Sequence, residues 1–312
     1  MKKSIAIVFV VLSLAMSFEM PAKESKKIYS SQISRDAKKL DANQIAMWLT
    51  NDGSLCRNPE TGNAGFNYPK GSDKYAVYAS GIRLVGKVDG EIRIARIDYA
   101  SEFQAGKILP TGLPDDANLE KYRLYKIRPG DSANHNESAY NKDYEEWPIA
   151  DGAPIDEMGQ PLILGDQTIW FVMNDANPAE HFNDTAPLGV EVQVLVWAYN
   201  LLSPLAKTVF IEYTIINRSE KTITDAYIGH WADPDLGGAN DDASACDTLL
   251  NLTYVYNGDD TDDSYGTSVP AVGFCMLQGP VVPSPGEVAF QFRRSQIDNA
   301  KNLNMTSNSV YY

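Results

Sequence analysis

Apolar and polar residues alternate at a period of two in several segments, which is the pattern of half-buried β-strands. Residues 82–88 and 92–94 alternate on either side of Asp89-Gly90. Two such runs joined by Asp-Gly predict an antiparallel hairpin with a two-residue type I′ turn. This is the sharpest local prediction that the pattern supports.

The longest alternation lies in the second half of the chain. Val, Ile and Tyr recur at every second position over 190–196 and again over 209–215, separated by a loop at 200–207. We expect these two strands to pair antiparallel across that loop. Further strands are predicted at 168–173 and near 226–231.

Between these strands the chain is rich in turn residues. Segments 51–73 and 106–165 are dominated by loops, and the chain carries 22 Gly, 17 Pro and 17 Tyr. No pattern of 10 to 15 helical residues separates the strands, as a parallel sheet would require. The predicted fold class is therefore all-β: an antiparallel β-sandwich or jelly-roll-like fold with long loops and little helix.

The N-terminus has the order of a secretory signal, with Lys2 and Lys3 before an apolar run. As a helix that run covers about 18 Å, too short for a hydrocarbon layer of about 30 Å, so no membrane span is expected. We predict a signal peptide at 1–22, a polar lead-in at 23–45 with one short helix, and a β-sandwich module at 46–312. The last residues resemble the middle of a strand, so we expect the module to be truncated at its C-terminus.

The net negative charge of the chain excludes some classes of binding partner. The 312 residues include 27 basic and 41 acidic side chains, a net charge of −14, which repels nucleic acid and anionic membrane surfaces. With 44% apolar and 22% charged residues, the composition is that of a globular chain. We expect a secreted or extracellular protein, held at the cell surface or released, whose partner is an extracellular glycan or a surface protein.

Asp residues are concentrated in one segment. Between 225 and 263 there are ten Asp and no Lys, Arg or Glu. Converging carboxylates repel one another and require a counter-charge, and Ca²⁺ accepts about six to eight oxygen ligands at irregular angles. We therefore predict a structural Ca²⁺ site in the loop at 233–242, with these ligands: Asp233, Asp235, Asn240, Asp241 and Asp242.

Two observations limit the calcium prediction. The loop has acidic groups at its first and third positions and a Gly at its sixth, but Gly237 occupies the fifth and Ser244 the twelfth, so it is not a helical-hand calcium loop. Asp, Asn and Gly are also ordinary turn residues. A second acidic stretch at 257–263 supplies either further ligands or a solvated turn.

The three cysteines, Cys56, Cys246 and Cys275, cannot form a disulfide framework. A Cys246–Cys275 bridge is the preferred pair and would stabilise the fold by roughly 3 to 4 kcal/mol. Three reduced, buried thiols are the equal alternative.

Catalytic motifs are weak. The three His residues form no zinc-binding array, and no Gly-x-Ser-x-Gly elbow occurs. Glu191 and Glu212 are the obvious glycosidase pair, but the expected register places Glu212 opposite Leu195, about 13 Å along the strand from Glu191. We therefore predict that the protein is not an enzyme.

The aromatic residues are also compatible with a second function, the binding of an extracellular polysaccharide. Trp170 and Trp197 lie in strong strand patterns and are expected in the core, whereas Trp147 and Trp231 are candidates for a sugar-stacking surface. The alternative function is thus an extracellular polysaccharide-binding module or a component of a glycoside hydrolase.

Four segments that together take in most of residues 45–312 carry a resemblance to known proteins. They are VFIEYTIINRSEKTITDAYIGHWADPDLGGANDDASACDTLLNLTYVYNGDD, SVPAVGFCMLQGP, GFNYPKGSDKYAVYASGIRLVGKVDGEIRIA and DQTIWFVMND. This part of the chain resembles a recurrent module of large secreted surface proteins of Bacteroidota-type bacteria. Those proteins carry type IX secretion sorting domains or fibronectin type III repeats. The resemblance implies an extracellular, mostly β protein and no particular activity. It departs from those chains in lacking the sorting domain and an Asp/Asn-Gly-rich insertion after Gly152 to Pro154. Together these features predict a secreted cell-surface or adhesion-type structural module, stabilised by Ca²⁺ and without catalytic activity.

Overall fold

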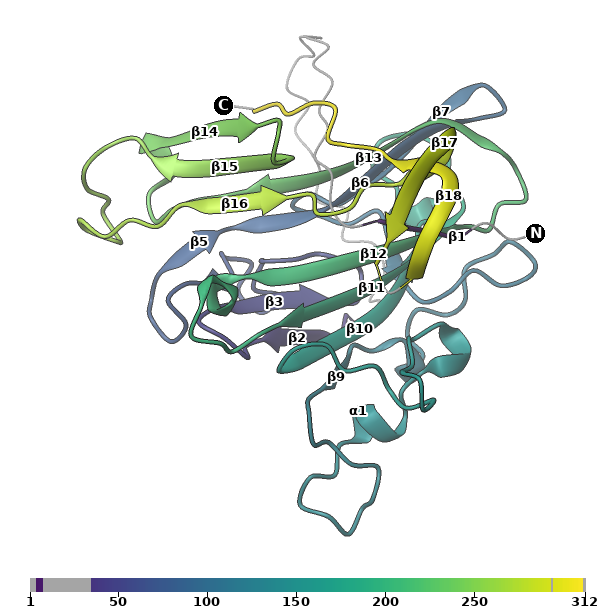
Figure 1. The fold of residues 1–312 in the computed structure, drawn as a ribbon, viewed down its shortest axis with the longest axis horizontal. Coiled ribbons are helices and arrows are strands. Elements are labelled where there is room, and N and C mark those ends of the chain that lie inside the picture. The colour runs from purple at the N-terminus through teal and green to yellow at the C-terminus, as the bar shows by residue number, and fades with distance from the viewer. Residues whose placement is uncertain (1–3, 8–34, 293, 311–312) are drawn as a thin grey trace.

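The computed structural model describes residues 4–7, 35–292 and 294–310. Its regular structure is almost entirely β-strand, which confirms the predicted all-β class (Figure 1). The strands of the first half are β1 (Ser4–Ile7), β2 (Ala37–Leu40), β3 (Ala46–Thr50), β4 (Phe66–Asn67), β5 (Tyr75–Val77), β6 (Ala79–Val88), β7 (Glu91–Arg96), β8 (Gln104–Ala105) and β9 (Tyr125–Ile127). Those of the second half are β10 (Gln167–Asn174), β11 (Val190–Ala198), β12 (Val209–Asn217), β13 (Ile223–Asp233), β14 (Asp242–Asp247), β15 (Leu252–Asn257), β16 (Val272–Cys275), β17 (Val281–Gln291) and β18 (Arg294–Asn302). The helical elements are α1 (Lys142–Glu145) and the 3-10 turns η1 (Glu120–Tyr122), η2 (Ile149–Asp151), η3 (Pro178–Glu180), η4 (Pro204–Lys207) and η5 (Ala239–Asp241).

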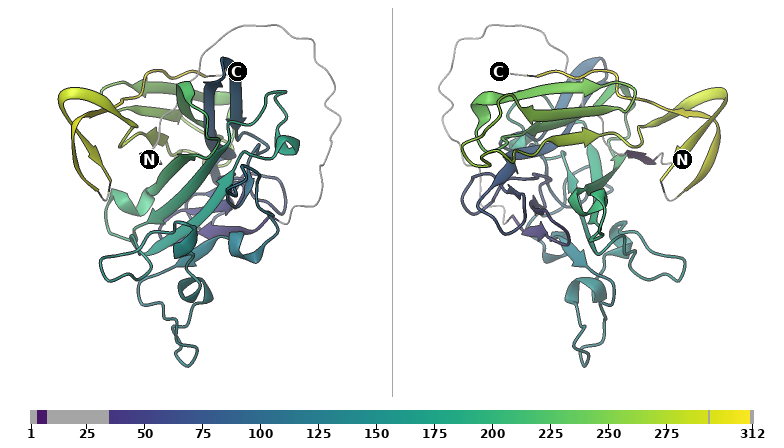
Figure 2. Two further views of the ribbon diagram at one scale, coloured as in Figure 1. Left: turned by 90° about the vertical axis from the view of Figure 1, so that its right-hand side faces the viewer. Right: turned by 60° about the vertical axis from the view of Figure 1, so that its left-hand side comes forward.

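The strands form two facing layers with two additions. The main sheet has the order β1-β12-β11-β10-β8, and β9 also pairs with β10. The facing layer consists of β13-β6-β7 and β2-β3-β4-β5, which are joined by isolated bridges from Leu55 to Leu49 and to Ser80. A side sheet, β14-β15-β16, and the β17–β18 hairpin complete the fold (Figure 2). The result is a sandwich-like arrangement of antiparallel sheets.

The strongest sequence patterns form the predicted pairs. β11 and β12 are antiparallel, and Leu195 lies opposite Glu212 as expected. The β6–β7 hairpin turns at Asp89 and Gly90, whose φ angles of 54° and 85° match the predicted type I′ turn. Strand β10 is buried along its whole length, because apolar groups cover both faces of the main sheet.

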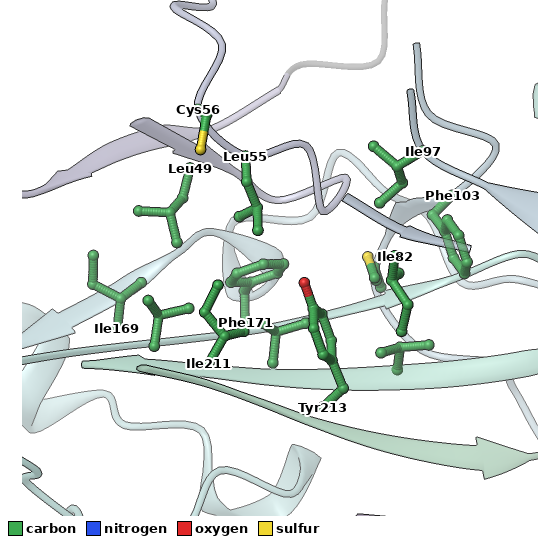
Figure 3. Packing of buried hydrophobic residues seen from close by; sticks show 14 of the residues in the cluster. Leu49, Leu55, Cys56, Ile82, Ile97, Phe103, Ile169, Phe171, Ile211 and Tyr213 are labelled. Atoms are coloured by element: carbon green, nitrogen blue, oxygen red, sulfur yellow. The ribbon is translucent and has the colours of Figure 1, made fainter. Parts of the chain in front are cut away.

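The principal core lies between the main sheet and the facing layer. Figure 3 shows Ile169, Phe171 and Ile211 of the main sheet pointing toward Leu49 and Leu55 of the facing layer. Each of these side chains is at most 7% exposed. Burying a side chain of this size stabilises the fold by about 1.5 to 3 kcal/mol.

A second core covers the outer face of the main sheet. Trp170 and Trp197 are buried there, as predicted. The Trp170 ring lies beside those of Tyr125 and Trp147, and the Trp197 ring stacks on Phe210. Trp147 is only 5% exposed and donates its indole N–H to the carbonyl of Pro154 at 2.8 Å. The prediction of Trp147 as a surface platform is therefore wrong, because the loop-rich segment folds back over the sheet.

The predicted lead-in also differs from the structure at its C-terminal end. Residues 37–40 form β2, which pairs with β3, and Leu40 is fully buried. Lys38 forms an ion pair with Asp143, and the ammonium group of Lys39 lies 4.5 Å from the ring centroid of Trp48. These contacts stabilise β2, which at four residues is too short to show an alternating pattern of apolar and polar residues in the sequence.

The predicted signal peptide lies outside the described residues except for Ser4–Ile7, which pair with β12 as β1. Across the described ranges, no helix is both long and apolar enough to cross a membrane.

Candidate functional site: an acidic and aromatic cavity beside β13

The five predicted calcium ligands lie in one segment, which runs from the end of β13 through η5 to the start of β14. Asp233 ends β13, Asp242 begins β14, and Asp235 lies in the loop between them. Asn240 and Asp241 belong to η5, where Asn240 is exposed. The segment thus crosses from the facing layer to the side sheet.

Three of these residues, Asp233, Asp235 and Asp242, line a cavity of about 350 Å³. The cavity lies between β13 and the side sheet, and residues 308–310 form part of its wall. Ligand pockets in proteins usually enclose roughly 300 to 1,000 Å³, so this cavity can hold a small molecule or the end of a larger one.

Aromatic side chains form another part of the wall. Trp231 and Tyr99 both line the cavity, with ring centroids 5.1 Å apart and planes at 82°. The guanidinium carbon of Arg83 lies 5.2 Å from the Trp231 ring centroid, within the range of a cation–π contact. The Tyr99 hydroxyl donates to Asp233 Oδ2 at 2.8 Å. Trp231 and Asp233 are therefore held in fixed positions by residues of another strand and loop.

Three buried polar atoms at this cavity have no hydrogen-bond partner among the described residues: Asp242 Oδ1, Ser244 Oγ and Ser309 Oγ. The other oxygen of Asp242, Oδ2, accepts from the Leu236 backbone N–H at 2.9 Å. Buried polar groups in proteins are nearly always paired, but these three atoms lie beneath the accessible surface of the wall, so they do not themselves contact an occupant of the cavity.

The carboxylates interact electrostatically. Burial raises the pKa of Asp235 to about 6, and the charges of Asp233 and Asp242 add to the effect. Burial also raises the pKa of Asp242, against the lowering effect of the Leu236 N–H. Three carboxylates and one guanidinium, that of Arg83, line the cavity, so its charge is negative on balance, as the concentration of Asp in the sequence predicts.

The arrangement of the acidic side chains does not by itself support the predicted calcium site. Within the described residues, no three His, Cys, Asp or Glu side chains are arranged to hold a metal ion. Calcium binding would require Asp233, Asp235 and Asp242 to move together from the positions seen here. The Ca²⁺ site stays a prediction.

The second acidic stretch is explained as a turn. Asp262 Oδ1 accepts backbone N–H groups from Ser264 at 2.8 Å and from Tyr265 at 2.6 Å. Asp262 Oδ2 accepts from Gly238 at 2.7 Å, which fastens the turn to the loop after β13. These bonds are those of an Asx turn, so Asp262 acts structurally.

The cysteines are all free. Cys246 lies on β14 and Cys275 on β16, with β15 paired between them. Two strand spacings of about 4.8 Å place these Cα atoms beyond the limit of about 7 Å for a disulfide. The preferred Cys246–Cys275 bridge is therefore not formed, and of the three thiols only that of Cys56 is fully buried.

The sequence could not identify the whole cavity. Arg83 and Tyr99 come from β6 and the loop after β7, more than a hundred residues before Trp231. No local pattern marks them, because their role depends on how β13 pairs with β6.

The electrostatics of the cavity predict that Asp235→Asn stabilises the protein at neutral pH. The pKa of the Asp235 carboxyl is higher in the folded protein than in the unfolded chain, so the folded state binds this proton more tightly. Proton binding therefore stabilises the fold fully at pH values below 3.8, the ordinary pKa of Asp. This stabilisation is lost as the pH rises to about 6, the pKa in the folded protein. Removing the charge should raise the free energy of unfolding by about 1 kcal/mol after screening by solvent.

Urea unfolding of both proteins at neutral pH and near pH 4 measures this effect, which should shrink at the lower pH. Asp260→Asn, in the exposed acidic turn, is the matched control and should change little. A destabilised Asp235→Asn protein in the absence of metal would contradict the proposed cost of burying this charge near two other carboxylates.

No protein-family model matches the chain, and no curated protein or solved structure matches it significantly.

Proposed function

We propose that this protein is a secreted, adhesion-type surface module that binds an extracellular glycan in the cavity beside β13 and catalyses no reaction. One observation carries the proposal: Trp231, Tyr99 and the carboxylates of Asp233, Asp235 and Asp242 line a single cavity of about 350 Å³. Sugars present hydroxyl donors and an apolar ring face together. Carboxylates accept from the hydroxyls, and aromatic rings pack against the apolar face.

Secretion and surface location are part of the same proposal. Their support is the Lys2-Lys3 and apolar pattern at the N-terminus, the net charge of −14 and the resemblance to secreted surface modules. An extracellular location would bring the cavity into contact with polysaccharide.

Hydrolysis of a glycan is the second candidate function. The observation in its favour is the pKa of Asp235, which burial raises to about 6, the value that suits a general acid, beside the carboxylates of Asp233 and Asp242. Glu191 and Glu212 do not supply an alternative pair, because β11 and β12 place them four residues apart in register.

A glycan array followed by a reducing-sugar assay separates the two functions. Binding of a defined glycan without release of reducing ends supports the binding module. Release of reducing ends that Asp235→Asn abolishes, with binding retained, would favour the hydrolase. An array without any bound glycan would contradict both.

Calcium stays part of the proposal as a stabilising ion near Asp233, Asp235 and Asp242. Its support is the mutual repulsion of these carboxylates, which a divalent cation would offset. At ten times its dissociation constant, Ca²⁺ should stabilise the folded state by about 1.4 kcal/mol and raise the melting temperature by a few degrees. Asp235→Asn should lose most of this gain. An unchanged melting temperature after EDTA, with no heat of calcium binding, would exclude the ion.

A further inference from the structure

A second cavity, of about 420 Å³, lies inside the sandwich on the other side of Phe274 and His230 from the acidic cavity. Strands β3, β4, β5, β12 and β16 contribute to its wall. Its chemistry is different, because most of its wall is apolar. The principal apolar groups are Met47, Phe66, Val77, Ile211, Val272 and Phe274.

This cavity leaves part of the core incompletely covered. Phe66, Val209, Val272 and Phe274 pack against the principal core, but each remains only partly buried. Apolar surface in contact with water costs about 25 cal/mol per Å², so an apolar occupant would be stabilised by covering it. A polar sugar would not satisfy such a wall.

The charge at this cavity also has a clear pattern. None of the described residues that line it is Asp or Glu, although the chain contains 41 acidic residues. Its one lining cation is Lys207, which is exposed at the end of η4 and forms no ion pair within the described residues. The Lys207 ammonium lies 5.9 Å from the ring centroid of Tyr68, which also lines the cavity.

The buried end is uncharged at neutral pH. Burial raises the pKa of the Cys56 thiol to about 12 and lowers the pKa of His230 to about 3. The Cys56 thiol is within hydrogen-bond distance of the Ser80 hydroxyl, at 3.4 Å. The cavity is thus neutral and mainly apolar inside, with a single positive charge at an exposed position on its wall.

We propose that this cavity binds a fatty acid, with the alkyl chain against the apolar wall and the carboxylate beside Lys207. The ligand class follows from the pairing of one cation with an apolar interior that has no acidic side chain on its wall. This site is separate from the glycan cavity, so neither proposal depends on the other.

Calorimetric titration of the full chain with sodium dodecanoate, below its micelle concentration, tests the proposal. Lys207→Glu should weaken dodecanoate binding roughly tenfold, since it replaces an attractive contact by a repulsive one. The same variant should bind dodecanol within about twofold of the parent protein, because the alcohol carries no charge. Lys301→Glu, an exposed position on β18, is the matched control and should leave both affinities unchanged.

Val272→Trp fills the cavity and should abolish binding of both ligands. Because Lys207 is exposed, the Lys207→Glu result remains interpretable even where the tryptophan variant does not fold. Absence of dodecanoate binding, or equal effects of Lys207→Glu and Lys301→Glu, would overturn the proposal. A dimer in sedimentation velocity that Val272→Trp dissociates, together with no binding of dodecanoate, would show a second copy in the cavity instead, and would also overturn the proposal.

Discussion

Arg218→Ala is expected to destabilise the protein by about 3 kcal/mol, among the largest effects of a single substitution in this fold. Arg218 donates to Glu191 through Nη2 at 2.7 Å and through Nε at 3.3 Å. The Glu191 side chain is completely buried, and its other hydrogen bond among the described residues comes from the backbone N–H of Ile108 at 3.2 Å. Removing the guanidinium leaves a buried carboxylate without its counter-charge.

Guanidinium chloride unfolding of the parent and the variant measures this loss. Lys221→Ala is the control, because Lys221 pairs with Asp89 at the surface, where the two side chains are 51% and 62% exposed. That pair is screened by solvent and should contribute little to stability. Replacing both partners, as Glu191→Leu with Arg218→Met, should recover much of the stability. Equal losses for Arg218→Ala and Lys221→Ala would show that burial does not set the strength of these pairs.

Trp231→Ala is expected to weaken glycan binding by about 2 kcal/mol or more, roughly thirtyfold in the dissociation constant. The indole is the large apolar surface at the acidic cavity, and Tyr99 and Arg83 hold it in place. The substitution should leave the fold intact, because Trp231 is only partly buried. Calorimetry with the glycan identified on the array measures the change.

Tyr227→Ala is the matched control for this variant. Tyr227 is an aromatic residue of the same strand, 52% exposed, and it does not line the cavity. Its removal should change the affinity by less than about twofold. Equal losses in the two variants would place the glycan along β13 rather than in the cavity.

Much of the main sheet could be predicted from the sequence because local pattern determines it. Alternation over 190–196 and 209–215 fixed which faces are buried, and the length of the loop set the register of Leu195 with Glu212. Asp89-Gly90 determined the turn of the β6–β7 hairpin, since both residues adopt positive φ. These features depend on neighbours in the chain.

Predictions that depended on distant contacts were less successful. Trp147 beside Pro148 resembles a surface residue in sequence, but the segment that carries it covers the main sheet. The Cys246–Cys275 pairing requires the two cysteines to be close in space, but β15 lies between the strands that carry them. The Asp-rich segment was correctly identified as a place where negative charge gathers, while the cavity it lines needed Arg83 and Tyr99 from far away.

Hydrogen–deuterium exchange with and without the array-identified glycan tests the central claim most directly. We expect slower exchange at the residues that line the acidic and aromatic cavity, chiefly 229–235, 242–244 and 308–310. Protection centred instead on the segment around Trp147, or no protection at a saturating glycan concentration, would contradict a binding site beside β13.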